Sequence, residues 1–298
     1  MKSKNAGIKA FIPPTALYRD IVRSALLEDV GHGDITTSCT IEADTRGLGE
    51  IIAKEEGRLA GLFVAVEAFR QVDPGLSFSE TLEEGESFHE GDTLIAVKGR
   101  ASSILMAERV ALNFLQRLCG IATLAKRYCE QIDGTGCRLV GTRKTTPNLR
   151  ILEKYALRAG GAMNHRFSLS DGILIKDNHI AACGGISEAV RAARERAPHT
   201  LKIEVEVTDI EEMKEAISAG ADAVLLDNMT PDEITRAAGM ARQLKPGLLI
   251  EASGGINLEN VGQFAAAGAD IISSGALTHS FKSVDLSLKL KIQGASRA

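Results

Sequence analysis

Tryptophan is absent from this sequence, and aromatic residues make up only 4% of it. Proteins that bind single-stranded nucleic acids stack the bases on aromatic side chains, and few such surfaces can be built here. The net charge of −4 also lacks the excess of Lys and Arg that a phosphate backbone attracts. We therefore expect no nucleic-acid partner, although an acidic chain can still form a local basic pocket.

Long apolar runs are missing as well. No charge-free stretch approaches the ~20 apolar residues that a membrane helix needs, and residues 1–7 lack the apolar core of a signal peptide. The five cysteines form no Cys-x-x-Cys pair, which favours free thiols in a reducing compartment. We expect a cytoplasmic protein that has no membrane partner.

The 298 residues, 44% of them hydrophobic, allow one large domain or two modest ones. A tail of about a dozen residues ends at Pro13-Pro14, and a helical pattern follows over 15–30. Between about 48 and 100, short alternating runs separated by Gly-rich turns predict a small, mostly antiparallel sheet with a helix near 61–72. A long helix is expected over 102–132, with Arg109 as an unusual charge among apolar neighbours.

After residue 137 the chain alternates regularly between strands and helices. The apolar strands are predicted at 138–141, 172–175, 201–207, 223–226, 247–251 and 270–273. Thr230 to Glu233 form a capping box, and Asn257 is a second candidate helix N-cap. Such alternation predicts a parallel sheet with helical crossovers, either a barrel that is incomplete or an open doubly wound sheet. No Gly-x-Gly-x-x-Gly motif opens a helix, which disfavours dinucleotide binding.

Functional residues of α/β barrels lie after the carboxyl ends of the strands, and charged or small residues follow nearly every strand predicted here. The first group is cationic and suits an anionic ligand, because an Arg guanidinium group can donate two parallel hydrogen bonds to one carboxylate. Its members are Arg143, Lys144, His165, Arg166 and Lys176, with Arg109 as a further candidate. The alternative for any one of them is a solvated surface charge.

Two further groups follow other strands. Glu204 and Glu206 alternate with apolar residues and should face the barrel lumen. Glu206 and Asp227 are candidates for Mg²⁺, for ribose hydroxyls or for a developing positive charge, and a salt bridge from Glu206 to Lys176 or Lys202 is the structural alternative. Glu204, deeper in its strand, better suits a structural role. Two turns of small residues can offer backbone N–H groups to a phosphate, Ser253-Gly254-Gly255 and Ser274-Gly275-Ala276. His279 lies either beside the second turn or at the cap of the following helix.

Several segments resemble the motifs of the quinolinate phosphoribosyltransferase family, also called nicotinate-nucleotide pyrophosphorylase (carboxylating). Three of them are Gly141 to Thr145, Gly160 to Arg166 and Ile175 to His179. The resemblance keeps the motif order from about residue 17 to 285. It also covers 28–36, 107–113, 204–207, 225–228, 251–255 and 275–279.

The resemblance implies an amino-terminal α/β sandwich over 1–118, an incomplete α/β barrel over 119–281, and a tail, 282–298, that packs with the sandwich. It implies a homodimer in which Arg109 enters the partner's active site. Quinolinate would be held by Arg109, Arg143, His165, Arg166 and Lys176, near Thr142. Lys144, Glu206 and Asp227 would serve phosphoribosyl pyrophosphate together with Mg²⁺ as the cofactor, and the two small-residue turns would bind the 5-phosphate.

The implied reaction transfers phosphoribosyl to quinolinate with loss of CO2, giving nicotinate mononucleotide for NAD biosynthesis. Three alternatives stay open. One is a molybdenum-transport paralogue of the same fold. Another is a transferase that uses nicotinate without decarboxylation. The third is a non-catalytic barrel that binds a sugar phosphate.

Overall fold

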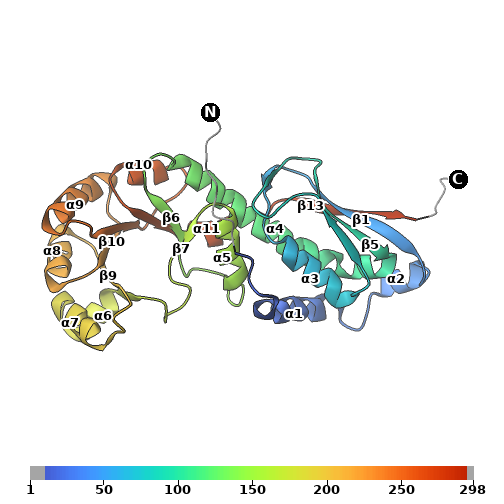
Figure 1. Ribbon diagram of the computed structural model, residues 1–298, viewed down its shortest axis with the longest axis horizontal. Coiled ribbons are helices and arrows are strands. Elements are labelled where there is room, and N and C mark those ends of the chain that lie inside the picture. The colour runs from blue at the N-terminus through green and yellow to red at the C-terminus, as the bar shows by residue number, and fades with distance from the viewer. Residues whose placement is uncertain (1–10, 294–298) are drawn as a thin grey trace. The chain divides into compact units, whose positions relative to one another are not determined.

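The structure, a computed structural model, describes residues 11–293 and divides into two compact units. Unit 1 contains the chain up to Lys126 together with 146–161 and the segment from Phe281 onward (Figure 1). Unit 2 contains Arg127–Thr145 and Ala162–Ser280. Most of the tail expected before Pro13 lies outside the described residues. The sequence had not predicted that 146–161 would group with unit 1.

Unit 1 is built on an antiparallel sheet with the strand order β13-β1-β5-β3. Strand β1 buries every second residue, from Gly47 to Ala53, which is the two-residue period expected of a half-buried strand. Strand β13 pairs with β1, so segments more than 200 residues apart in the sequence lie side by side in one sheet. The strands of this unit are β1 (Arg46–Ala53), β2 (Gly57–Arg58), β3 (Ser77–Glu80), β4 (Ser87–Phe88), β5 (Thr93–Arg100) and β13 (Leu286–Ile292).

The helices predicted over 15–30, 61–72 and 102–132 are confirmed with small changes of boundary as α1 (Arg19–Val30), which the short helix η1 (Thr15–Leu17) precedes, α3 (Leu62–Val72) and α4 (Ala101–Gln131). The helices α2 (Ile35–Thr40) and α5 (Arg150–Ala159) were not predicted. Tyr18, Phe63 and Tyr155 join the entry to α1, α3 and α5 through edge-to-face ring contacts, with centroids 5.0 and 4.8 Å apart. These contacts explain why α5 belongs to unit 1 although its sequence neighbours belong to unit 2.

Unit 2 is a curved parallel sheet of seven strands, in the order β7-β6-β12-β11-β10-β9-β8. Helices α7 to α10 lie along the outside of the curve (Figure 1). The strands are β6 (Arg138–Gly141), β7 (Met163–Asn164), β8 (Ile173–Ile175), β9 (Ile203–Val207), β10 (Ala223–Asp227), β11 (Leu249–Ser253) and β12 (Ile271–Ser274). The helices are α6 (Asp177–Cys183), α7 (Ile186–Arg196), α8 (Ile210–Ala219), α9 (Pro231–Leu244), α10 (Val261–Ala266) and α11 (Ala276–His279).

This arrangement confirms the incomplete barrel and excludes the doubly wound alternative. Within the described residues, the edge strands β7 and β8 do not pair, so the sheet does not close. The capping box from Thr230 to Glu233 is also confirmed: the Thr230 backbone N–H donates to Glu233 over 2.8 Å at the start of α9.

Three details of unit 2 differ from the predictions. Strand β7 was missed, because two residues are too short to show a period. Strand β11 begins two residues later than predicted, because a turn formed by Lys245 to Leu248 precedes it. Asn257 does not cap α10. Its side chain accepts from the backbone N–H groups of Glu259 and Asn260, and the helix begins after Asn260.

None of the helices within 11–293 is both long enough and apolar enough to span a lipid bilayer.

Candidate active site

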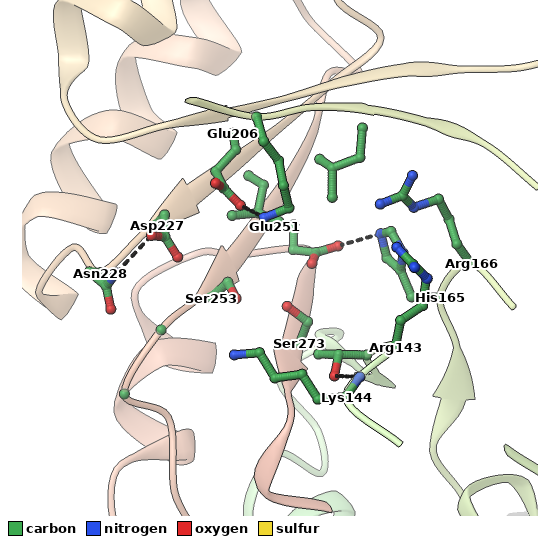
Figure 2. Close-up of a pocket in the computed structure, with 16 residues that line it drawn as sticks. Arg143, Lys144, His165, Arg166, Glu206, Asp227, Asn228, Glu251, Ser253 and Ser273 are labelled. Atoms are coloured by element: carbon green, nitrogen blue, oxygen red, sulfur yellow. Dashed lines mark hydrogen bonds and ion pairs between the residues drawn. The ribbon is translucent and has the colours of Figure 1, made fainter. Parts of the chain in front are cut away.

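A cavity of about 580 Å³ opens at the carboxyl ends of the unit 2 strands (Figure 2). Parallel strands deliver their following loops to the same edge of a sheet, which is why side chains distant in sequence meet here. The lining residues are Thr142, Arg143, Lys144, His165, Arg166, Leu174, Lys176, Glu206, Leu225, Asp227, Asn228, Glu251, Ser253, Gly254, Gly255 and Ser273. The cavity thus gathers most of the residues that the sequence had suggested for a site.

Two arginines form the most distinctive part of the cavity wall. Arg143 follows β6 and Arg166 follows β7, and the Nε atom of each is buried without a hydrogen-bond partner in the described structure. Burial, followed by the positive charge of Arg143, lowers the pKa of Arg166. Buried donors without acceptors and crowded like charges are both unfavourable. An anionic ligand with carboxylate oxygens would relieve both.

Two lysines also line the cavity but differ in their contacts. Lys176 follows β8 and pairs its ammonium group with the carboxylate of Glu206 on β9 (Figure 2). The salt bridge considered as the structural alternative for Glu206 is therefore present. Lys144 is exposed, and its backbone N–H donates to Thr142 Oγ1 over 3.1 Å. Lys144 is the most exposed of the cationic residues that line this cavity.

Glu206 and Asp227 lie across the cavity from Arg143 and Arg166, whereas Glu251 lies beside His165 (Figure 2). Glu206 belongs to β9 and Asp227 ends β10, where its Oδ2 accepts a 2.7 Å hydrogen bond from Asn228 Nδ2. As predicted from the alternation in β9, Ile203, Val205 and Val207 are buried in the core, while Glu204 and Glu206 face inward. The site therefore has a cationic half and an anionic half.

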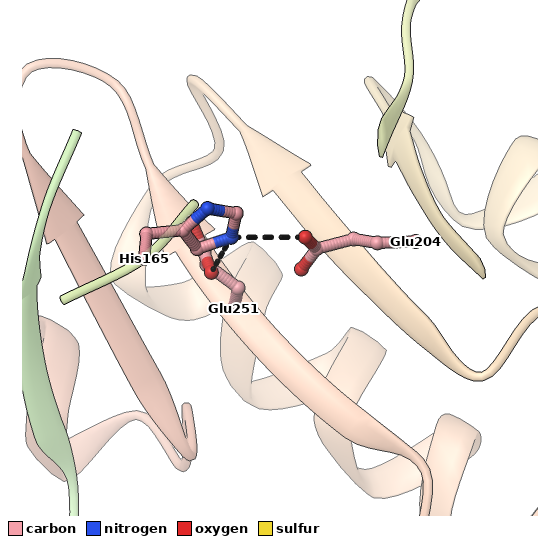
Figure 3. Close-up of side chains that lie close together, drawn as sticks. All are labelled: His165, Glu204 and Glu251. Carbon is pink, nitrogen blue, oxygen red and sulfur yellow. Dashed lines mark hydrogen bonds and ion pairs between the residues drawn. The ribbon is translucent and has the colours of Figure 1, made fainter. Parts of the chain in front are cut away.

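His165 sits between two acids beneath the cationic half. Its Nε2 lies 3.0 Å from Glu204 Oε2 and 3.3 Å from Glu251 Oε2 (Figure 3). The hydrogen bond to Glu204, followed by the close contact with Glu251, raises the pKa of His165 to about 9. At neutral pH this imidazole is therefore protonated and belongs with the cations.

The turn after β11 supplies backbone groups to the cavity. Gly254 has a φ of 91° and Gly255 a φ of 63°, conformations that disfavour residues with a Cβ. A Cβ on Gly254 would also collide with the side-chain amide of Asn228, which itself has a φ of 55°. This close packing turns the backbone of Ser253 to Gly255 toward the cavity, as a phosphate site requires.

Some of the predicted residues do not line the cavity. The hydroxyl of Ser274 is buried and donates to the Ile256 carbonyl over 3.0 Å, so this side chain has a structural role. The neighbouring turn, Gly275 and Ala276, leads into α11, where the Nδ1 of His279 shares a 2.8 Å hydrogen bond with Ser280. Gly275 packs close to Lys144 and His279. Arg109 lies on an exposed face of α4 in unit 1.

The sequence interpretation missed several lining residues, chiefly Glu251. The predicted strand ended at this residue, whereas β11 continues to Ser253, so Glu251 points into the unit with only 2% of its side chain exposed. The signal was available, because an acid inside a strand that is otherwise apolar needs a buried partner. Leu174, Leu225, Asn228 and Ser273 carried no comparable signal.

The chain matches known proteins over almost all of its length. Residues 34–119 match the family model for the N-terminal domain of quinolinate phosphoribosyl transferase, and residues 121–289 match that for its C-terminal domain. A probable nicotinate-nucleotide pyrophosphorylase (carboxylating) from Bacillus subtilis is 43% identical over 278 residues, covering 93% of this chain and 95% of the relative. The human nicotinate-nucleotide pyrophosphorylase (carboxylating) is 40% identical over 286 residues, covering 95% of each.

The fold matches equally well. The crystal structure of NadC from Streptococcus pyogenes superimposes with a TM-score of 0.90 at 40% identity, covering 95% of this chain and 99% of that one. The two family models, the identity over the full length and the shared two-unit structure agree. The chain belongs to the quinolinate phosphoribosyl transferase family.

Proposed function

We propose that this chain transfers the phosphoribosyl group of phosphoribosyl pyrophosphate to quinolinate and releases pyrophosphate and CO2. The product is nicotinate mononucleotide, a precursor of NAD. The observation that carries this proposal is the pair of buried guanidinium Nε atoms, of Arg143 and Arg166, that lack acceptors in a cavity also lined by Glu206 and Asp227. Such a cavity suits a diacid beside a sugar whose C1 becomes positive.

Quinolinate would occupy the cationic half. Its two adjacent carboxylates match the two guanidinium groups, and the protonated His165 and Lys176 add charge from neighbouring strand ends. Binding a dianion here offsets the mutual repulsion of the cations. Lys176 can turn from Glu206 toward the ligand, which would leave the Glu206 carboxylate available to the sugar.

Phosphoribosyl pyrophosphate would occupy the other half. The turn of Ser253 to Gly255 would take the 5-phosphate on backbone N–H groups, together with the turn of Ser274 to Ala276 beyond the cavity wall. His279 would lie beside that second turn. The exposed ammonium of Lys144 would neutralise the pyrophosphate end of the substrate.

The first chemical step forms a bond between the pyridine nitrogen and ribose C1, while the bond from C1 to the pyrophosphate oxygen breaks and its electron pair leaves with pyrophosphate. Positive charge develops on the sugar in this transition state. Glu206 and Asp227 are fixed carboxylates that would stabilise that charge. Holding two anionic substrates in line is the larger task, because free in water they repel one another.

Decarboxylation follows from the charge that the first step leaves on the ring. The pyridine nitrogen is now cationic, and it stabilises the electron pair left at the adjacent carbon when the bond to the carboxylate breaks. A proton then adds to that carbon. The other carboxylate stays on the ring, and the product is nicotinate mononucleotide.

Mg²⁺ is the cofactor that the proposed phosphoribosyl transfer implies. Glu206 and Asp227 offer the hard oxygen donors that Mg²⁺ prefers, and because Glu206 also holds Lys176, the ion would be held largely through substrate and water. When bound, Mg²⁺ would neutralise the departing pyrophosphate.

The family resemblance further suggests a homodimer in which Arg109, exposed on α4, completes the partner's quinolinate site. We place the enzyme in the cytoplasm, since its five cysteines are all free thiols.

A direct assay separates the proposal from its alternatives. The purified chain should release pyrophosphate from phosphoribosyl pyrophosphate and Mg²⁺ when quinolinate is added, and not when nicotinate is added. Turnover with nicotinate alone would indicate the transferase that acts without decarboxylation. Ligand binding without pyrophosphate release would indicate a sugar-phosphate sensor. The carboxylating relatives, about 40% identical to this chain, do not favour either alternative.

A further inference from the structure

Two acids next to His165, Glu204 and Glu251, have no role in the proposed reaction, and their position suggests one. Glu204 on β9 and Glu251 on β11 reach the same nitrogen, Nε2 of His165, at 3.0 and 3.3 Å (Figure 3). The exposed side-chain fractions are 19% for His165, 12% for Glu204 and 2% for Glu251. Three ionisable groups are thus packed together with little solvent to stabilise their charges.

This geometry fixes where the imidazole holds its first proton. A nitrogen that faces two carboxylates must carry a hydrogen, because a lone pair there would repel both. The N–H is directed at Glu204, while Glu251 Oε2, which lacks a hydrogen-bond partner of good geometry among the described residues, is left to be stabilised by charge. In a neutral His165, Nδ1 would then be a hydrogen-bond acceptor.

The state of Nδ1 decides what the cavity can bind. His165 lines the cavity, and none of the residues in 11–293 makes a recorded hydrogen bond to its Nδ1, so this nitrogen is available to a ligand. As an acceptor it would repel a carboxylate. As a donor in the imidazolium it would bind one through a charge-assisted hydrogen bond.

The surrounding charges decide between these states. Glu204 and Glu251 favour the imidazolium, whereas burial of the ring opposes it, and the positive charges of Arg143 and Arg166 in the same wall would act in the same direction as burial. The carboxylates are in contact with the ring, and their effect prevails, raising the pKa of His165 to about 9. Burial raises the pKa of Glu204, but imidazole is intrinsically the stronger base, so the shared proton resides on the ring.

We propose that Glu204 and Glu251 are positioning residues that keep His165 as an imidazolium, so that its Nδ1–H binds a carboxylate of the acid substrate. The proposal rests on the proposed function, because it names the diacid as the ligand. It extends that function by making substrate affinity depend on two acids that do not themselves bind the substrate.

A metal ion is the competing occupant of this cluster. One ligand atom from each of the three side chains lies within 4.8 Å of the others. A bound ion would need Nε2 without its proton, and it would add two positive charges beside Arg143 and Arg166. A proton on Nε2 fits the observed contact distances and adds one positive charge between the two acids, which is why we choose it.

The decisive measurement is an NMR titration of His165 in the unliganded protein, which needs no substrate. The His165→Gln variant assigns its signal among the six histidines. In the wild type the midpoint should lie near pH 9. In Glu251→Gln, and separately in Glu204→Gln, it should fall by about one pH unit or more toward the ordinary value near 6.5. Glu259→Gln, an exposed acid after the same strand, should leave the midpoint unchanged.

The kinetic readout is the pH profile of kcat/KM for quinolinate. Between pH 6.5 and 8.5 the Glu251→Gln variant should lose about threefold or more relative to Glu259→Gln, because a midpoint at pH 8 or below leaves His165 mostly deprotonated at pH 8.5. The loss should be in KM for quinolinate rather than in KM for phosphoribosyl pyrophosphate. Two Gln variants are used so that one remains if the other fails to fold.

A His165 midpoint near 6.5 in the wild type overturns the proposal, as does a midpoint that neither Gln variant moves. Zinc or manganese abolishing the titration at micromolar concentration overturns it in favour of a metal site. If the titration behaves as expected but quinolinate is not consumed, the proposed function fails while the imidazolium assignment stands.

Discussion

The ammonium group of Lys176, at the end of β8, is paired with the carboxylate of Glu206 on the neighbouring strand β9. This pair joins the cationic and anionic halves of the cavity. It holds the Glu206 carboxylate beside the cavity that Lys176 also lines. If an anionic ligand binds as proposed, Lys176 would have to exchange this partner for the ligand.

Glu206→Gln should lower kcat on the order of 100-fold, because an amide cannot stabilise positive charge developing at ribose C1. The KM for quinolinate should change much less, since Arg143 and Arg166 remain. Steady-state kinetics with each substrate varied in turn measures this split. Glu211→Gln, an exposed acid on α8, is the matched control. A variant with normal kcat would remove Glu206 from the chemistry.

Arg143→Lys should raise the KM for quinolinate by about 10- to 100-fold, since an ammonium group cannot replace a guanidinium fork that binds a carboxylate twice. The control is Arg138→Lys, an exposed arginine at the opposite end of the same strand, β6. Near-normal quinolinate affinity in Arg143→Lys, measured by calorimetry, would count against this contact.

Gly254→Ala and Gly255→Ala form a pair that tests the phosphate turn. Both positions have positive φ, which costs an alanine about 1 kcal/mol, but only Gly254 would also collide with Asn228, whereas Gly255 has open space around it. The KM for phosphoribosyl pyrophosphate should therefore rise at least several-fold more in Gly254→Ala. Equal effects in the two variants would mean that backbone strain alone matters and that the turn is not packed for a ligand.

Much of the site was predictable because strand ends carry its chemistry. A charged residue that follows an apolar run, as Lys176 follows β8 and Asp227 ends β10, is visible in a single sequence. Glu251 was not recognised, because it stood as the last residue of the predicted strand, whereas β11 continues to Ser253 and places this acid inside the strand. The placement of α5 in unit 1 was also not predictable, since it depends on ring contacts such as Phe63 with Tyr155, which are distant in sequence.

Arg109 offers a test of the proposed dimer. Arg109→Ala alone and Lys144→Ala alone should both be nearly inactive. If Arg109 enters the partner's site, refolding the two variants together should restore activity to about a quarter of all sites. About half of the dimers are then mixed, and one of the two sites in each mixed dimer contains both wild-type residues. No recovery in a mixture shown to contain mixed dimers would place the whole site within one chain.

The most direct test of the central claim is the release of labelled CO2 from quinolinate carrying carbon-13 in the carboxylate next to the ring nitrogen. The account predicts that CO2 appears only when phosphoribosyl pyrophosphate is present, in equal amount to pyrophosphate and nicotinate mononucleotide. Pyrophosphate release without labelled CO2, or CO2 release that does not need phosphoribosyl pyrophosphate, would contradict it.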